Sequence, residues 1–130
     1  MGGPCPCGSG PAYRFCCGPK HSGETSAPTA EALMRSRYAA FVVGDADYLL
    51  RTWHPATRPE DLRLDSVHEW TGLEVLATSA GQVDDSEGTV TYRASLRARD
   101  GRPGALLEDA RFERRGRRWV DVDGDIRAGA

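Results

Sequence analysis

The sequence predicts an α+β fold, in which two N-terminal helices pack on a curved four-stranded antiparallel sheet, preceded by a small metal-bound knuckle. Three observations predict this fold. The only four cysteines of the chain lie within its first seventeen residues. Apolar residues then recur at helical spacing, and beyond residue 70 the apolar period changes to two. Helices followed by a run of strands are typical of an α+β domain with the helices on one face of the sheet.

The cysteine cluster has the spacing of a metal site. Cys5 and Cys7 form a short arm, eight residues make a loop, and Cys16 and Cys17 close the site. Four sulfurs can then converge within about 4 Å of one another, as a tetrathiolate site requires. We expect one structural zinc ion, because tetrahedral thiolate sites favour zinc, with iron as the alternative metal. Four thiolates leave no open position for a substrate, which argues against a catalytic ion.

Two other uses of the cysteines stay open. In a disulfide framework, a bridge between the adjacent Cys16 and Cys17 would be strained, and bridges to Cys5 and Cys7 would close only a loop of about ten residues. A redox or metal-transfer site is the second alternative, although the Cys-x-x-Cys spacing is absent. No hydrophobic signal segment precedes the cluster, so an oxidising compartment is not indicated and we expect a cytoplasmic protein.

The knuckle is predicted to span residues 1–23. Ser9 can donate a hydrogen bond to the thiolates from outside the inner shell. His21 is expected to be solvated or to lie in the outer shell, because four cysteines already complete a tetrahedral inner shell. Small polar residues at 24–28 indicate a linker, which leads into a cone-like domain over residues 29–130.

Two helices are predicted after the linker. The first begins after Thr29, a suitable N-cap, and ends at Gly44, a suitable C-cap. Its apolar face is made of Leu33, Met34, Tyr38, Phe41 and Val42. The second begins at Asp45 and ends at His54, because the proline that follows His54 disfavours helix there. Residues 58–64 indicate a turn with at most one turn of helix.

Four strands follow, over residues 70–78, 89–99, 105–114 and 118–122. The second of them alternates without fault, and its apolar face consists of Val90, Tyr92, Ala94, Leu96 and Ala98. Turns that contain glycine separate the second, third and fourth strands. Strands joined in this way predict an antiparallel meander, covered on one face by the two helices.

The knuckle resembles a known metal-binding motif. The sequence Cys-Pro-Cys-Gly-Ser-Gly, an aromatic residue at Tyr13 and the sequence Cys-Cys-Gly together resemble the SEC-C motif, known from the C-terminal tail of the preprotein-translocase ATPase SecA. This resemblance implies that the four cysteines are the metal ligands.

The rest of the chain is similar to the YchJ family of small bacterial proteins. The similarity rests on Ala-Glu-Ala-Leu-Met-Arg-Ser-Arg-Tyr at residues 30–38, Thr-Trp-His-Pro at 52–55 and Trp-Val-Asp-Val-Asp-Gly at 119–124. It implies a SEC-C motif joined to a cone-like domain of the nuclear-transport-factor-two type. The family pattern often has a histidine before the glutamate of the third strand, where this chain has Leu107.

Cone folds often bind small apolar ligands, and their enzymes place a carboxylate or a histidine in the pocket. The candidate catalytic groups here are Glu108, which shares a strand face with apolar residues, and His54. The residues expected to line the pocket are Arg37, Tyr38, Tyr48, Trp53, Trp70 and Phe112, with His68 as a further member. Arg37 is the expected partner of Glu108. A structural ion pair surrounded by core aromatics is the simpler interpretation of these residues.

Two classes of function remain. The favoured one is a binding or adaptor module, whose structural zinc knuckle contacts a protein or ribosomal partner, because the metal signature is specific and catalytic residues are not fixed by spacing. The alternative is an enzyme or small-ligand carrier that uses a pocket of the cone with Glu108 as the titrating group. On this weighing the chain is expected to bind rather than to catalyse.

Charge and composition narrow the partners. The net charge of −2 gives no general attraction to nucleic acid, and no apolar run approaches the ~20 residues of a membrane span. Five arginines lie between residues 111 and 118. They could touch RNA phosphates, but the chain has sixteen arginines against one lysine, and we interpret them as a solvated hairpin tip. A homodimer formed through the sheet is a further expectation.

Overall fold

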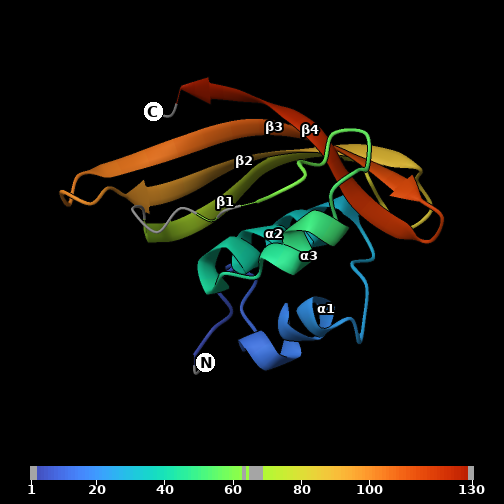
Figure 1. The fold of residues 1–130 in the computed structure, drawn as a ribbon, viewed down its shortest axis with the longest axis horizontal. Coiled ribbons are helices and arrows are strands. Elements are labelled where there is room, and N and C mark those ends of the chain that lie inside the picture. The colour runs from blue at the N-terminus through green and yellow to red at the C-terminus, as the bar shows by residue number, and fades with distance from the viewer. Residues whose placement is uncertain (1–2, 63, 65–68, 129–130) are drawn as a thin grey trace.

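The structure is a computed structural model that describes residues 3–62, 64 and 69–128. The chain forms three layers (Figure 1). A four-stranded sheet lies on top, two helices cover its inner face, and the knuckle packs against the far side of the helices. The elements in chain order are η1 (Tyr13–Phe15), α1 (Gly18–Ser22), α2 (Ala30–Val43), α3 (Ala46–Arg51), β1 (Glu69–Ala80), β2 (Glu87–Arg97), β3 (Pro103–Arg115) and β4 (Arg118–Ala128). The predicted α+β fold is confirmed.

Both main helices begin where their capping residues predict, and α2 also ends there, whereas α3 ends at Arg51 and not at His54 as predicted. The Thr29 side chain accepts a hydrogen bond from the backbone N–H of Ala32 at 3.1 Å, and Asp45 caps α3 through the N–H of Tyr48 at 3.0 Å. Gly44 ends α2 in the left-handed conformation, with φ of 82°, which a residue with a Cβ adopts only with strain. None of the described helices is both long and apolar enough to cross a membrane.

The sheet is an antiparallel meander in the order β1-β2-β3-β4. Its inner face is set by β2 and β3, where Val90 pairs with Ala110 and Tyr92 pairs with Glu108. The predicted strands are all present, but β4 runs on to Ala128 rather than ending at residue 122. Residues 123–128 are acidic and contain a glycine, which is typical of a loop. They form a strand nevertheless, because they pair with β3.

A β-bulge in this last ladder decides which acidic residues face inward. The register shifts between Arg111 and Phe112, so that Phe112 pairs with Asp121 while Arg111 pairs with Asp123. A bulge inserts one residue on one strand and redirects the side chains beyond it. Asp121 therefore faces the helices, whereas Asp123 forms an ion pair with Arg111 on the outer face of the sheet.

The outer face of the sheet is polar. Arg93 pairs with Glu74 across β1 and β2 at 3.3 Å, and Thr91 donates to Asp109 at 2.6 Å. The expected homodimer through the sheet stays a prediction.

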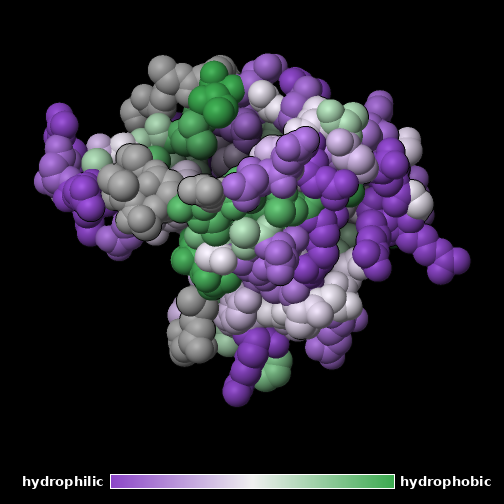
Figure 2. Space-filling view, viewed as in Figure 1, coloured by the Kyte–Doolittle hydropathy of each residue, from purple (hydrophilic) through white to green (hydrophobic). Residues whose placement is uncertain are grey.

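The main hydrophobic core lies between α2 and the sheet. Buried side chains from α2 meet buried side chains from the three later strands. These residues are Leu33, Met34, Tyr38, Val90, Ala94, Ala110, Phe112 and Trp119. Two of the sheet residues are alanines, which fill little space and leave room between the layers. Figure 2 shows apolar side chains gathered where the helices meet the sheet.

The knuckle is packed directly onto α2. Ala39 is fully buried against Cys5, Cys7 and Cys17. The guanidinium of Arg35 donates a hydrogen bond from Nη1 to the carbonyl oxygen of Cys7 at 2.8 Å. Through these contacts the knuckle forms the third layer of the molecule.

His21 was expected in solvent or in the outer shell of the metal, and this prediction is wrong. Its side chain is only 7% exposed, and its Nε2 donates to the carbonyl oxygen of Ser36 at 2.8 Å. The Tyr13 hydroxyl lies 2.6 Å from Nδ1, and the Tyr48 ring packs on the imidazole. His21 therefore fastens the short helix α1 to α2.

Candidate functional site: a thiolate cluster and a cavity in the cone

The four cysteine sulfurs are brought together by the loop of the knuckle. All four lie within 4.8 Å of one another, with 3.5 Å between the sulfurs of Cys7 and Cys16 and 3.9 Å between those of Cys16 and Cys17. A tetrahedral zinc ion with Zn–S bonds of about 2.3 Å would separate its sulfurs by roughly 3.8 Å. The cluster therefore has the size and the donor set of a tetrathiolate site, and no disulfide joins these residues.

The electrostatics of the cluster favour a cation. Contact with the Cys17 thiol, aided by the Ser9 hydroxyl, lowers the pKa of Cys7 to about 4, so this sulfur is a thiolate at neutral pH. The same contact raises the pKa of Cys17, because Cys17 holds the proton that the two sulfurs share. A thiol must lose its proton before it can coordinate a metal ion, so metal binding by the cluster would release protons.

Polar groups outside the cluster hold it in place. The Ser9 hydroxyl lies 3.2 Å from the sulfur of Cys7 and 3.0 Å from that of Cys16. Lys20 donates from Nζ to the carbonyl oxygen of Cys16 at 3.2 Å. The predicted role of Ser9 beside the thiolates agrees with this geometry.

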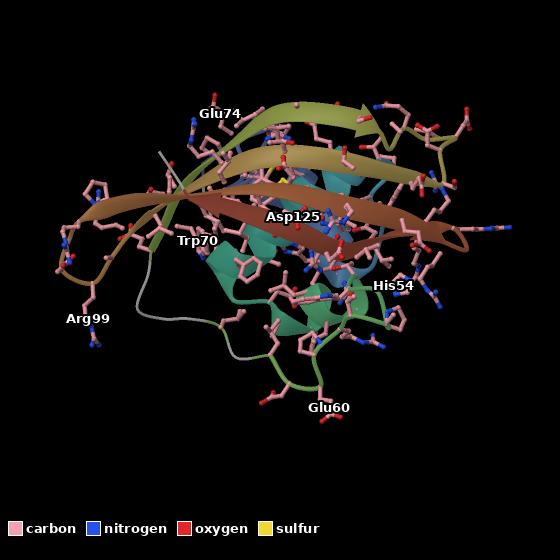
Figure 3. The ribbon with its side chains drawn as sticks, turned by 90° about the horizontal axis from the view of Figure 1, so that it is seen from above. His54, Glu60, Trp70, Glu74, Arg99 and Asp125 are labelled. Atoms are coloured by element: carbon pink, nitrogen blue, oxygen red, sulfur yellow. The ribbon has the colours of Figure 1, made fainter. Side chains whose placement is uncertain are left out.

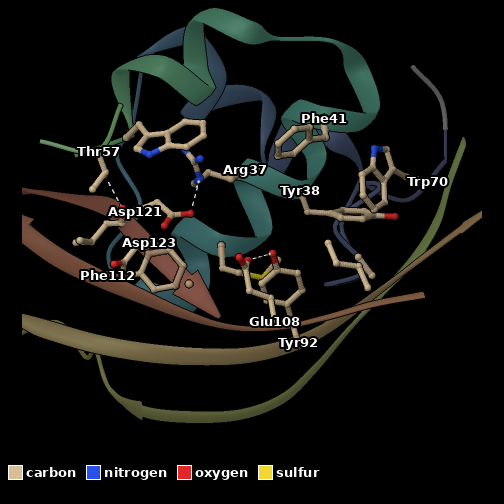
Figure 4. A pocket seen from close by; sticks show the side chains of 16 residues that line it. Arg37, Tyr38, Phe41, Thr57, Trp70, Tyr92, Glu108, Phe112, Asp121 and Asp123 are labelled. Carbon is tan, nitrogen blue, oxygen red and sulfur yellow. Dashed lines mark hydrogen bonds and ion pairs between the residues drawn. The ribbon is translucent and has the colours of Figure 1, made fainter. Parts of the chain in front are cut away.

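A cavity of about 420 Å³ lies between α2 and the inner face of the sheet. Its walls are mainly aromatic and apolar, and all four strands contribute to them. The principal lining residues are Met34, Arg37, Tyr38, Phe41, Trp53, Trp70, Tyr92, Leu106, Glu108, Phe112 and Asp121 (Figure 4). Pockets that hold small molecules have volumes of about 300–1,000 Å³ and combine apolar walls with a few polar groups, as this cavity does.

Arg37 and Asp121 form the first polar pair of the cavity. Arg37 Nε lies 3.1 Å from Asp121 Oδ2, and the arginine residue is only 6% exposed. Arg37 Nη1 also donates to the carbonyl oxygen of Leu49 and to the Thr52 hydroxyl, and the guanidinium lies over the Trp53 ring. The arginine is thus held by α3, by the segment after it and by β4 at once.

Glu108 and Tyr92 form the second pair. The Tyr92 hydroxyl donates to Glu108 Oε1, and burial raises the pKa of Tyr92, so it keeps its proton. The other carboxylate oxygen of Glu108 lies against Gly124 of β4, where a Cβ would come within 2.6 Å of it. The absence of a side chain at Gly124 therefore makes room for the carboxylate of Glu108.

Asp121 is the acidic residue of the cavity whose pKa is shifted. Burial raises the pKa of its carboxyl to about 6 from an ordinary value of 3.8, Arg37 opposes this shift, and the charge of Glu108 adds to it. The carboxyl groups of Asp121 and Glu108 face a cavity whose lining includes one arginine, Arg37, so the polar end of the cavity offers more hydrogen-bond acceptors than donors.

The structure brings most of the predicted pocket residues together, but one of them lies elsewhere and one predicted ion pair is not formed. Arg37, Tyr38, Trp53, Trp70, Phe112 and Glu108 all line the cavity. Tyr48 does not, because its hydroxyl is bonded to Ser36 and its ring packs on His21, on the knuckle side of α2. The expected pairing of Arg37 with Glu108 is also wrong, since Arg37 pairs with Asp121.

His54 lies outside the cavity. It is not among the residues that line the cavity, and Figure 3 shows it on the other side of the view from Trp70. Its Nε2 is 3.7 Å from a carboxylate oxygen of Glu113, and its Nδ1 accepts a hydrogen bond from the backbone N–H of Ala56. His54 therefore has a structural environment, at the end of the segment that follows α3. His68 lies outside the described residues.

Asp121 and Tyr92 are two polar cavity residues that the sequence analysis did not predict for the pocket. Tyr92 shares a strand face with Val90, which already predicts an inward hydroxyl. Asp121 lies two residues after Trp119, on the same predicted strand face as that core tryptophan. Residues two positions apart on a strand point to the same face, so the spacing from the apolar Trp119 could have identified Asp121 as inward-facing.

Replacing Gly124 with alanine is expected to displace the Glu108 carboxylate, because the new methyl group would also come within 3.0 Å of the Asp109 carbonyl oxygen. We expect a loss of about 1–2 kcal/mol in the free energy of unfolding, measured in urea. Gly72→Ala is the matched control, because a Cβ at Gly72 meets no atom within 4 Å. If both substitutions lower the free energy of unfolding equally, the Glu108 carboxylate does not pack against Gly124.

The titration of Asp121 is expected to have its midpoint near pH 6, and Glu108→Gln is expected to lower it, because the charge of Glu108 raises the pKa of Asp121. The folded protein holds more protons than the unfolded chain between the ordinary and the raised pKa. The contribution of Asp121 to the free energy of unfolding therefore falls as the pH rises from 3.8 to about 6. Carbon-13 NMR of the carboxyl groups measures the midpoint, and Asp125→Asn, on the outer face, should leave it unchanged. A midpoint that Glu108→Gln does not move would contradict this coupling.

Comparison with known proteins gives a consistent answer. A family model described as "YchJ, middle NTF2-like domain" matches residues 29–124. A UPF0225 protein of Streptomyces coelicolor is 57% identical over 123 residues, which cover 95% of each chain. A UPF0225 protein of Deinococcus radiodurans is 47% identical and covers 92% of this chain and 87% of its own.

Solved structures show the same architecture. The solution structure of a SEC-C motif containing protein from Rhodopseudomonas palustris superposes with a TM-score of 0.83 at 35% identity, covering 93% of this chain and 96% of the other. The crystal structure of a SEC-C motif containing protein from Psychrobacter arcticus gives a TM-score of 0.75 at 28% identity, with 92% and 80% covered. The matched region, the identity over nearly the full length and the shared fold show that this chain belongs to the YchJ family, also named UPF0225.

Proposed function

We propose that this protein binds a small aromatic molecule in the cone cavity and that its knuckle holds one structural zinc ion. The observation that carries the first part is the 420 Å³ cavity itself, in which aromatic walls enclose the buried Arg37 and the carboxylates of Asp121 and Glu108. A cavity of this volume beside buried polar groups destabilises a fold when it is empty, so a ligand that fills it would offset this cost.

The polar groups of the cavity indicate that the ligand carries a hydrogen-bond donor. Arg37 and Tyr92 already donate to the two carboxylates, and each carboxylate keeps acceptor capacity on its other positions. A phenol or an aromatic amine would place its ring among the aromatic walls and donate a hydrogen bond to Asp121 or Glu108. The mutual pairing of these four groups favours binding over catalysis, and the catalytic roles considered for Glu108 and His54 stay predictions.

A cavity-filling variant tests the ligand proposal. Leu106 lies in the wall, and Leu106→Trp would fill much of the open space. Isothermal titration with 2-naphthol and with tyramine is expected to give binding to the wild type and none to the variant. If the variant binds either compound as the wild type does, the ligand does not occupy the cavity.

The zinc assignment rests on the four convergent sulfurs. Four thiolates form a closed tetrahedral shell, which is typical of structural zinc, and such an ion holds together a segment too small for a core of its own. Elemental analysis of protein purified without added metal is expected to give one zinc per chain. One iron per chain would overturn the assignment of the metal but not of its ligands. Cysteines that hold a metal ion must stay reduced, so the zinc assignment also supports a cytoplasmic location.

A role of the knuckle as an adaptor is the second candidate. Phe15, between the two cysteine pairs, is 71% exposed, and the Arg14 guanidinium lies 4.8 Å from its ring centre. An exposed aromatic residue beside an arginine is typical of contact sites for proteins. Affinity capture is done with the wild type and with Phe15→Ser, both loaded with zinc. We expect the wild type to retain one protein or ribosomal partner that the variant loses. Identical captured sets would argue against this role.

A further inference from the structure

A second, smaller pocket lies where the knuckle, the end of α3 and the β3–β4 hairpin meet. Its volume is about 160 Å³. Four cationic side chains line it: Lys20 of α1, Arg51 of α3, and Arg115 and Arg118, which flank the hairpin turn. Among the described residues that line it, none is an aspartate or a glutamate. We call this site the basic pocket.

The cations of the basic pocket lack counter-charges. Within the described part of the chain, none of the four forms a salt bridge with a carboxylate, whereas arginines elsewhere do, such as Arg37 with Asp121. Four positive charges that converge without a carboxylate repel one another, and a bound anion would relieve this repulsion. The overall charge of −2 shows that this local excess is not a property of the whole chain.

Two of these side chains are held in position by the protein. Arg51 Nη2 donates to the carbonyl oxygens of Lys20 and His21, and its guanidinium lies over the Tyr48 ring. Lys20 is fixed through its hydrogen bond to Cys16. Arg51 still has N–H groups to offer, since a guanidinium carries five. The pocket is therefore partly organised before any ligand arrives.

We propose that the basic pocket binds a phosphate monoester group. Guanidinium groups match phosphate oxygens with paired hydrogen bonds, and a dianion suits four cations better than a carboxylate does. Thr25 and Ser26 add hydroxyl groups to the lining. The volume is below the ~300–1,000 Å³ of pockets for whole small molecules, so the pocket takes the charged end of the ligand and leaves the rest outside.

This site is independent of the proposed aromatic-ligand site. Of the residues that the structure describes, none lines both pockets. Arg114, a neighbour in the sequence, lies outside the basic pocket because its guanidinium covers the Trp119 ring and donates to the Asp85 carbonyl oxygen. Of the arginines in the hairpin, Arg115 and Arg118 therefore line the basic pocket, and Arg114 does not.

Charge reversal at two neighbouring residues tests the proposal. Arg118 lines the pocket and is exposed, and its side chain forms no hydrogen bond or ion pair with the described residues, so Arg118→Glu should leave the fold intact. Arg117→Glu is the matched control, because Arg117 is also exposed and changes the net charge equally but does not line the pocket. The zinc-loaded proteins are titrated with inorganic phosphate and with adenosine 5′-monophosphate at constant ionic strength, and the backbone amide signals of Gly23, Thr25 and Ser26 are followed by NMR.

We expect both probes to shift these amide signals, and we expect Arg118→Glu to weaken binding at least about tenfold while Arg117→Glu changes it by less than about twofold. Tighter binding of the nucleotide would identify a phosphorylated small molecule as the ligand, and equal binding would identify free phosphate. Equal losses in the two variants would overturn the proposal, since they indicate general charge attraction. Oligouridylates with and without a 5′-phosphate complete the test, because equal binding of both would show that the pocket takes a phosphodiester backbone instead.

Discussion

Replacing Cys7 with serine is expected to remove the metal ion from the knuckle and to destabilise the whole chain. Cys7 is 1% exposed and its sulfur contacts those of its neighbours in the cluster. Structural zinc contributes about 10–16 kcal/mol of apparent binding free energy in small peptides, and the loss of one of four thiolates forfeits much of it. Elemental analysis should find almost no zinc in the variant.

The destabilisation should reach the cone because the knuckle is packed on α2. Without the metal, Ala39 and His21 lose the surface that buries them. A loss of about 3 kcal/mol would lower the melting temperature by about 10 °C in a domain of this size. Ser9→Ala serves as the control, because it removes a hydroxyl beside the sulfurs but keeps four ligands, and its metal affinity should fall only about 10–100-fold. If Cys7→Ser loses its zinc and melts like the wild type, the knuckle does not support the cone.

Replacing Arg37 with methionine is expected to cost about 3–5 kcal/mol in the free energy of unfolding, because it leaves Asp121 buried without its partner. The variant also gives up the hydrogen bonds to Leu49 and Thr52. Arg97→Met is the control, since Arg97 and Glu69 form an exposed pair at 3.8 Å, and exposed pairs contribute about 0–1 kcal/mol.

The cost of Arg37→Met should depend on pH. Below the raised pKa of Asp121, near pH 6, the carboxyl is increasingly neutral and needs its partner less. Urea unfolding at pH 5 and pH 7.5 should therefore give a smaller difference between variant and wild type at the lower pH. The double variant Arg37→Met and Asp121→Leu should recover part of the loss, because no charge is left unpaired. Equal costs for Arg37→Met and Arg97→Met would show that the buried pair is not formed.

Local patterns in the sequence predict the elements of this fold well. Thr29 and Gly44 bound α2 as their capping chemistry predicts, and the strict alternation along β2 identifies its inner face. The cysteine spacing similarly indicates a single cluster. These features depend on residues close together in the chain, whose physical preferences can be judged without knowing the rest of the structure.

Contacts between elements were harder to predict. Tyr48 and Arg37 lie on helices with apolar faces, but the sequence does not say that α2 is covered by the sheet on one side and by the knuckle on the other. Tyr48 turned out to face the knuckle. The one-residue bulge that follows Asp121 in β4 turns Asp123 to the outer face, so that Asp121 and Asp123 have different partners, and a bulge has no strong local signature.

The three tryptophan indoles test the central claim, that the cone cavity is a ligand site. Trp53 and Trp70 line the cavity, whereas Trp119 is buried elsewhere and donates from Nε1 to the Pro28 carbonyl oxygen. Nitrogen-15 NMR of the indole N–H groups, during titration with a panel of small phenols and aromatic amines, reports on all three at once. We predict that at least one compound shifts the signals of Trp53 and Trp70 in a saturable way and leaves that of Trp119 in place. If every compound leaves the first two signals unchanged, or moves all three together, the cavity is not the binding site.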